Sequence, residues 1–154
     1  MKNYDDSVLQ MWNDFVMLNP EYRNEKYTSW YFCDNKNCAD ELAGLVVKGE
    51  KRATASLFYW YDSGKEEMPV IGNISIITDW DGIAKCIIKT KSVTKIPFKN
   101  VNSEMAFTEG EGDKTLDYWR KAHISFFTRE SETENIEFTG DTLIVFEEFE
   151  LVFK

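Results

Sequence analysis

The sequence predicts an α+β fold in which a partly closed β-barrel is flanked by helices. Segments with the alternation or the aromatic and β-branched content of strands outnumber those with helical periodicity. These strand-like segments surround a few helices along the chain, which is typical of an α+β architecture. No internal repeat or low-complexity linker divides the sequence, so residues 1–154 are expected to form a single domain.

The first third of the chain predicts two helices and one strand. Acidic and serine capping residues at 5–7 precede apolar side chains spaced three to four apart, until Asn19-Pro20 stops the pattern. Residues 27–32 are aromatic and β-branched, as in a short strand. Asn37 is expected to cap the second helix, and Gly49 to end it, because glycine adopts a left-handed turn at low cost.

The rest of the chain predicts mainly strands. Residues 55–61 are short and apolar, and either a buried strand or a helical turn fits them. A hairpin is predicted from 72–78 and 83–93 around a turn that closes on glycine, with Pro97 ending this part of the sheet. One more helix and a long closing strand are predicted from the stripe Leu116, Trp119, His123 and Phe126 and from the alternation over 142–153.

Composition excludes several classes of protein. The chain lacks the long apolar run of a membrane-spanning helix, and its N-terminus lacks the apolar core of a signal peptide. Three cysteines without paired metal-ligand spacing, together with a single histidine, predict a reduced, cytoplasmic protein without a zinc site. A net charge of −9 argues against a general nucleic-acid binder.

Charge is nevertheless distributed unevenly. Residues 82–103 contain five lysines and no acidic residue, whereas residues 104–150 contain thirteen acidic residues against four basic ones. A local basic face could therefore contact a nucleotide or RNA although the whole molecule is acidic. The alternative is that these lysines occupy the solvent-exposed side of a strand.

The hexad Gly49-x-Lys51-x-x-Thr54 carries the first candidate chemistry. It follows a predicted helix, and connections after helices commonly present functional side chains. A lysine can serve as a base if burial lowers its pKa, and a threonine hydroxyl can become a nucleophile beside a base. The alternative is an ordinary helix end followed by a solvated lysine and a β-forming threonine.

The loop Glu109-Gly110-Glu111-Gly112-Asp113 carries the second set of candidate catalytic groups. Its glycines permit a close backbone approach, and its carboxylates offer acid–base or cation-binding groups, although the spacing is not that of an EF-hand. A solvated acidic turn before a helix is the alternative. His123 lies on the apolar stripe of that helix and is expected more often in a hydrogen-bonded, partly buried role than as a catalyst.

Several stretches together resemble one family. They are Trp30-Tyr31-Phe32, Ala39-Asp40-Glu41-Leu42, Gly49-x-Lys51-x-x-Thr54-x-Ser56, Pro69-x-x-Gly72, Ile96-Pro97-Phe98, Glu109-Gly110-Glu111-Gly112-Asp113 and Trp119-Arg120-x-x-His123-x-x-Phe126-Phe127. Their order and spacing resemble the ASCH domain family, and in particular its small bacterial members. The resemblance covers nearly the whole chain and implies a PUA-like fold.

The resemblance also implies a function. Small ASCH members include amidohydrolases that remove the acetyl group from N-acetylcytidine, with a lysine, a threonine and a downstream glutamate as the proposed catalytic set. Matched to this sequence, the set is Lys51, Thr54 and Glu111, with Glu109 as the alternative glutamate. The chain is longer than the minimal amidohydrolases. The residues expected to bind substrate are Trp30, Arg52, Ser56, Glu109, Arg120 and His123.

Two hypotheses about function follow from these observations. In the first, a desolvated Lys51 with a lowered pKa takes the Thr54 proton, and Glu111 orients Lys51 or carries a proton to the leaving amine. In the second, the chain is a non-enzymatic RNA-binding regulatory module, or a ribonuclease, of the same fold. The partner is then a modified nucleoside or RNA, with no membrane, no cofactor and no metal, and the oligomeric state is open.

Overall fold

The computed structural model describes residues 4–154. A five-stranded sheet with the order β1-β3-β4-β5-β2 runs through the molecule, and helices lie on both of its sides. The strands are β1 (Tyr27–Trp30), β2 (Ala53–Leu57), β3 (Ile74–Thr78), β4 (Ala84–Pro97) and β5 (Leu143–Phe153). The first pair, β1 and β3, is parallel, and the other three pairs are antiparallel.

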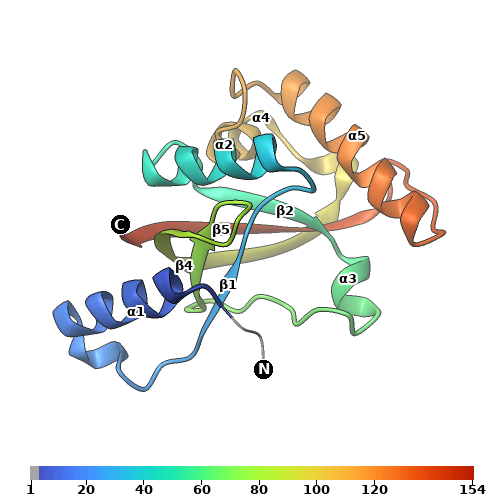
Figure 1. Ribbon diagram of the computed structural model, residues 1–154. Helices are drawn as coiled ribbons and strands as arrows, with labels where there is room; N and C mark the ends of the chain where they lie inside the picture. The colour runs from blue at the N-terminus through green and yellow to red at the C-terminus, as the bar shows by residue number, and fades with distance from the viewer. Residues whose placement is uncertain (1–3) are drawn as a thin grey trace.

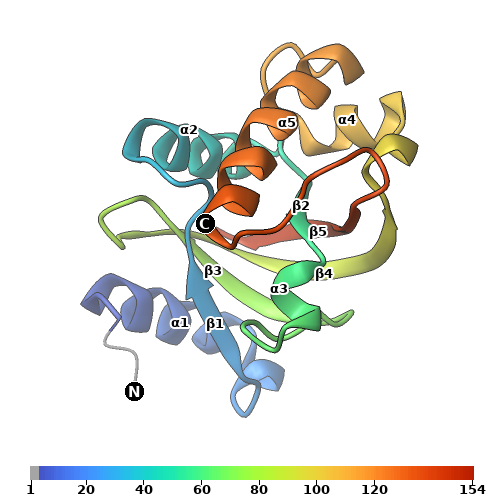
Figure 2. The same cartoon turned by 90° about the vertical axis from the view of Figure 1, so that its right-hand side faces the viewer.

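In the described part of the chain, five α-helices and two short 3₁₀ helices, at Pro20–Tyr22 and Phe98–Asn100, accompany the sheet. The α-helices are α1 (Asp6–Leu18), α2 (Lys36–Val47), α3 (Tyr59–Asp62), α4 (Ser103–Glu109) and α5 (Leu116–Thr133). Both ribbon views place α2, α4 and α5 on one side of the sheet and α1 on the other (Figures 1 and 2). The α+β class is therefore confirmed, but within residues 4–154 the sheet is not closed into a barrel.

The hydrophobic core is divided by the sheet. Val8, Trp12 and Phe15 of α1 pack on isoleucines of β3 and β4, because successive strand side chains point to opposite faces. On the other side, α2 packs through its apolar stripe on Ile77, Ile88 and their neighbours. A third cluster joins α4 and α5 to the end of the sheet formed by β2, β4 and β5. The helices that frame the pocket described below are thus fixed by burial of apolar surface.

Most of the predicted elements are present, with shifted boundaries. The second helix is capped by Asn35, whose side chain accepts a hydrogen bond from the Cys38 amide, so the expected cap at Asn37 is wrong. The ambiguous segment after the hexad contains both alternatives, since β2 is followed directly by the single turn of α3. Strand β4 continues to Pro97, and a register shift between Thr90 and Ser92 lets it follow β5 over this length.

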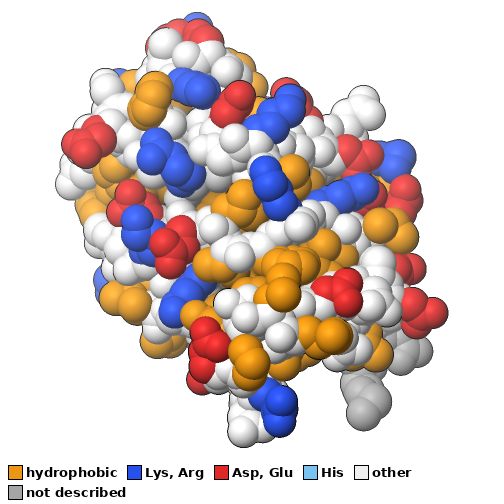
Figure 3. Space-filling view, turned by 90° about the vertical axis from the view of Figure 1, so that its left-hand side faces the viewer, with side chains coloured by type: hydrophobic (Ala, Val, Ile, Leu, Met, Phe, Trp, Pro, Cys, Tyr) orange, Lys and Arg blue, Asp and Glu red, His pale blue; other side chains and the backbone are white. Residues whose placement is uncertain are grey.

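The lysines of residues 82–103 are engaged mostly with neighbouring side chains. Lys85 pairs with Asp79, Lys89 donates to the Tyr22 hydroxyl, Lys95 lies over the Phe58 ring and Lys99 pairs with Asp141. On the face seen in Figure 3, basic side chains are interspersed with acidic and hydrophobic ones and form no continuous band. Within residues 4–154, no helix has the length and apolarity needed to cross a bilayer.

Candidate functional site

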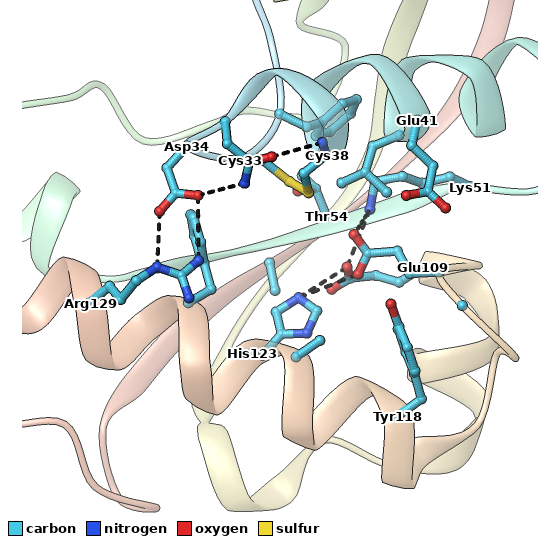
Figure 4. Close-up of a pocket in the computed structure, with 18 residues that line it drawn as sticks. Cys33, Asp34, Cys38, Glu41, Lys51, Thr54, Glu109, Tyr118, His123 and Arg129 are labelled. Atoms are coloured by element: carbon cyan, nitrogen blue, oxygen red, sulfur yellow. Dashed lines mark hydrogen bonds and ion pairs between the residues drawn. A yellow bond between two sulfur atoms is a disulfide. The ribbon is translucent and has the colours of Figure 1, made fainter.

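A pocket lies between α2 and α5, and β2 contributes to its wall (Figure 4). Its cavity volume is about 150 Å³. The polar and charged side chains that line it include Asp34, Lys51, Thr54, Glu109, Glu111 and His123. The two predicted motifs, 58 residues apart at Lys51 and Glu109, therefore meet in one cavity.

Glycines bring the two motifs together. Gly49 has a φ of +77°, the left-handed conformation that lets the chain leave α2 and enter β2. Gly110 has a φ of +72° and lies against the preceding loop, where a Cβ atom would stand only 2.0 Å from the Glu50 carbonyl oxygen. The Arg52 amide also donates to the Thr108 carbonyl at 2.9 Å. The close approach predicted for the glycines of the acidic loop is thus present at Gly110.

Lys51 is buried, and its ammonium group is surrounded by acceptors. Nζ lies 2.8 Å from the Ala53 carbonyl oxygen, 3.2 Å from Glu109 Oε2 and 3.5 Å from Glu111 Oε1. Burial disfavours the ammonium form, but the charges of Glu111 and Glu109 outweigh it, so the pKa of Lys51 lies above its usual value. The expectation that desolvation lowers the pKa of Lys51 toward neutrality is therefore wrong, and Lys51 is a cation in this site.

The pKa values of the two glutamates shift in opposite directions although both side chains contact one lysine. Burial raises the pKa of Glu109, but Lys51 and His123 overcome this and bring it to about 2. Burial also raises the pKa of Glu111, where the charge of Glu109 opposes the lowering by Lys51 and the result is a raised pKa. Glu109 is therefore held in its anionic form, and Glu111 is the carboxyl whose pKa is moved toward neutral pH.

His123 and Trp119 hold Glu109 from the α5 side. The Trp119 indole donates to Glu109 Oε1 at 2.9 Å, and His123 Nε2 lies 3.3 Å from Glu109 Oε2. Because His123 Nδ1 contacts the Trp119 carbonyl oxygen at 2.8 Å, it must carry a proton there. Burial lowers the pKa of His123, but Glu109 more than compensates and the pKa is raised, which favours the doubly protonated ring. The expected hydrogen-bonded, partly buried histidine is thus present, and it also lines the pocket.

Thr54 lies on β2 at the floor of the pocket, opposite Glu147 of β5 in the sheet register. Among residues 4–154 its hydroxyl has no hydrogen-bond partner, so it is free to contact a molecule in the pocket. Thr54 is distinguished from the other hydroxyl side chains of this sheet by its place in the pocket lining, and not by a hydrogen bond to another residue.

Four of the residues expected to bind substrate lie outside the pocket. Trp30 packs edge-on against Phe32 in the core, and the Ser56 hydroxyl bonds to the Tyr61 hydroxyl at 2.7 Å. Arg52 and Arg120 have exposed side chains and do not line the cavity. Ser56 lies one pleat repeat beyond Thr54 along β2 and does not line the cavity.

One wall of the pocket was not predicted from the sequence. It is formed by residues of the segment 33–38, among them Cys33, Asp34, Asn35 and Cys38. Arg129 of α5 donates through Nε to Asp34 Oδ2 at 3.1 Å, which joins this wall to the opposite side of the pocket. Cys33 and Cys38 form a disulfide, so the expectation of reduced cysteines is wrong for this pair, while Cys86 is free and buried. A Cys-x-x-x-x-Cys spacing across a helix start was the available signal. A cytoplasmic location stays a prediction.

One group of side chains has the composition of a metal site. Ligand atoms of Glu109, Glu111 and His123 lie within 4.8 Å of one another. The ammonium group of Lys51 already contacts both carboxylates, however, and the raised pKa of His123 favours a protonated Nε2 facing Glu109. A divalent cation would compete with Lys51 for the carboxylate oxygens, so this donor set fits proton chemistry better than metal binding.

Comparison with known proteins identifies relatives of the whole chain. The family model described as the ASCH domain matches residues 28–153. A crystal structure of an ASCH domain from Lactobacillus crispatus JV V101 is 35% identical, with a TM-score of 0.93 over 100% of this chain and 99% of that one. A protein from Enterococcus faecalis V583 is 31% identical, with a TM-score of 0.86 over 96% and 89%.

A third solved structure, of a hypothetical protein, is 20% identical with a TM-score of 0.52 over 82% of this chain and 97% of that one, and it supports the fold alone. No curated protein matches the chain. The family model spans most of the sequence, including both motifs that meet in the pocket. The chain belongs to the ASCH domain family.

Proposed function

We propose that this protein is a nucleoside amidohydrolase that removes the acetyl group from an acetylated cytidine. The observation that carries the proposal is the meeting of Lys51, Thr54 and Glu111 in one pocket, where a cation, a free hydroxyl and a carboxyl of raised pKa face the same space. Amide hydrolysis needs these three functions: a nucleophile, a proton carrier and stabilisation of the oxyanion.

The proposed reaction has two steps. The Thr54 oxygen attacks the acetyl carbonyl while its proton passes to the Glu111 carboxylate, and the Lys51 ammonium stabilises the negative oxygen that forms. Collapse of this intermediate breaks the amide bond, and Glu111 returns the proton to the exocyclic amine of cytidine. Water then attacks the acetylated Thr54, again through Glu111, to release acetate and restore the hydroxyl.

The protonation states favour Glu111 rather than Lys51 as the base. A raised pKa places a carboxyl nearer to the operating pH, where it can both accept and donate a proton. Lys51, with its raised pKa, has no free amine to offer at neutral pH. Its role is electrostatic, and hydrogen bonds to Glu109 and the Ala53 carbonyl oxygen hold it in place.

The pH dependence of deacetylation tests this assignment. We expect kcat/KM for N-acetylcytidine to rise with pH through a pKa above 4.5, the ordinary value for glutamate, as Glu111 loses its proton. Glu111→Gln should lower kcat by about a hundredfold to ten-thousandfold and abolish this rise of kcat/KM with pH. Asp117→Asn, an exposed change on α5, is the control. Activity that rises only at alkaline pH would return the role of base to Lys51.

RNA binding is the second candidate, because the ASCH family is associated with RNA. The lysines of β4 are the feature that favours it. Neighbouring acidic and aromatic side chains contact four of the five lysines of residues 82–103, which weakens their attraction for phosphate. The amidohydrolase proposal has the stronger support because its groups share one pocket.

A further inference from the structure

We propose that Asp34 binds the 2′- and 3′-hydroxyl groups of a ribose, so that the pocket selects ribonucleosides over 2′-deoxyribonucleosides. This inference rests on the proposed function, because it takes the acetylated base to lie at Lys51 and Thr54. Asp34 lines the other end of the pocket, in the loop between β1 and α2.

The two ends of the pocket differ in exposure. The side chains of Lys51 and Glu109 are each 1% exposed, whereas those of Asp34 and Arg129 are 42% and 51% exposed. Figure 4 shows the Asp34–Arg129 pair well separated from Lys51 and Glu109, with His123 and Thr54 between them. A nucleoside whose amide reaches the buried end therefore directs its sugar, the most polar part, toward the open end.

The carboxylate of Asp34 is held in position. Arg129 donates to both of its oxygens, from Nε at 3.1 Å and from a terminal nitrogen at 3.4 Å, and Asn35 donates to Oδ1 at 3.2 Å. The Cys33–Cys38 disulfide closes the loop that carries it. The hydrogen bonds from Arg129 keep the pKa of Asp34 below its usual range, so the group is an anion at neutral pH.

An anionic carboxylate is a pure acceptor, and a vicinal diol supplies two donors that match its two oxygens. Acidic side chains bind ribose hydroxyls in this way at dinucleotide sites. A phosphate suits this end of the pocket less well, because the charge of Arg129 is already paired with Asp34. Glu41, Glu109 and Glu111 add further carboxylates to the lining, which disfavours an anionic ligand.

The test compares N-acetylcytidine with N-acetyl-2′-deoxycytidine as substrates, and cytidine with 2′-deoxycytidine as ligands in calorimetry. Loss of one hydroxyl should lower kcat/KM and affinity about tenfold to a hundredfold, the scale of a hydrogen bond to a charged group. Asp34→Asn should lower the ribonucleoside to the level of the deoxyribonucleoside. Asp117→Asn, which removes an exposed carboxylate outside the pocket, should keep the wild-type ratio.

The outcomes separate this inference from the proposed function. Hydrolysis of both substrates with equal kcat/KM would overturn the ribose site and leave the amidohydrolase standing. Failure to hydrolyse either, with cytidine still bound about tenfold more tightly than 2′-deoxycytidine and that preference lost in Asp34→Asn, would overturn only the reaction. Binding of neither ligand would overturn the ribose site, as would a preference that persists in Asp34→Asn.

Discussion

Thr54→Ala should reduce the release of cytidine from N-acetylcytidine by about 10⁴-fold to 10⁶-fold, the scale seen when a covalent nucleophile is removed. The reason is local, because Thr54 supplies the hydroxyl at the floor of the pocket and the variant leaves Glu111 without a hydroxyl to deprotonate. Steady-state turnover measures the effect. Mass spectrometry of the wild type during turnover should show a single acetyl group on Thr54.

Two controls distinguish loss of chemistry from loss of structure. Thr54→Ser keeps a hydroxyl and should retain part of the activity, whereas Thr94→Ala removes an exposed threonine of β4 outside this pocket and should change nothing. Both variants, and Thr54→Ala, should melt close to the wild type because the truncation removes only a few atoms at a half-buried position. Turnover by Thr54→Ala at the wild-type rate would rule out Thr54 as the nucleophile.

Glu109→Gln should lower the free energy of unfolding by about 3–5 kcal/mol at neutral pH, because it removes the nearer of the two carboxylate charges from the buried Lys51 and His123. Glutamine has nearly the same shape, so the loss reports charge rather than packing. Glu111→Gln is the matched control. Its carboxylate is disfavoured in the folded state, as its raised pKa shows, and neutralising it should cost little.

The lowered pKa of Glu109 predicts how the stability difference between wild type and Glu109→Gln changes with pH. The pKa of Glu109 falls from 4.5 to about 2 on folding, so its stabilising contribution is complete above 4.5 and is lost as the pH falls toward 2. Urea denaturation should therefore show the stability gap between wild type and Glu109→Gln narrowing over that range. Equal stabilities of Glu109→Gln and Glu111→Gln at neutral pH would contradict the distinction between a structural and a chemical glutamate.

Local patterns in the sequence were sufficient to predict most of the fold. Apolar spacing located α1 and the core of α5, alternation located β5, and Gly49 located the end of α2. These signals work because each records a local period or a backbone requirement. Helix α4 was missed because Ser103–Glu109 is short and its apolar positions are too few to define a period.

The candidate site was predicted in part. The resemblance supplied the pairing of the hexad with the acidic loop, and Gly110 shows the physical reason, since only a glycine fits against the Glu50 carbonyl. Charge states were not predictable, because the pKa of Lys51 depends on both carboxylates and on how fully all three are buried. Asp34 and Arg129 were missed because 95 residues separate them and no motif links them.

The most direct test of the proposed function is cytidine release from N-acetylcytidine by the wild type and by Lys51→Met, which keeps the apolar stem but not the charge. We expect turnover by the wild type and a fall of about a hundredfold to a thousandfold in the variant, the scale of losing one oxyanion-stabilising group. The melting temperature of Lys51→Met, measured beside that of the wild type, tests whether the variant is folded. No cytidine release by the wild type, or full release by a folded Lys51→Met protein, would contradict the proposal.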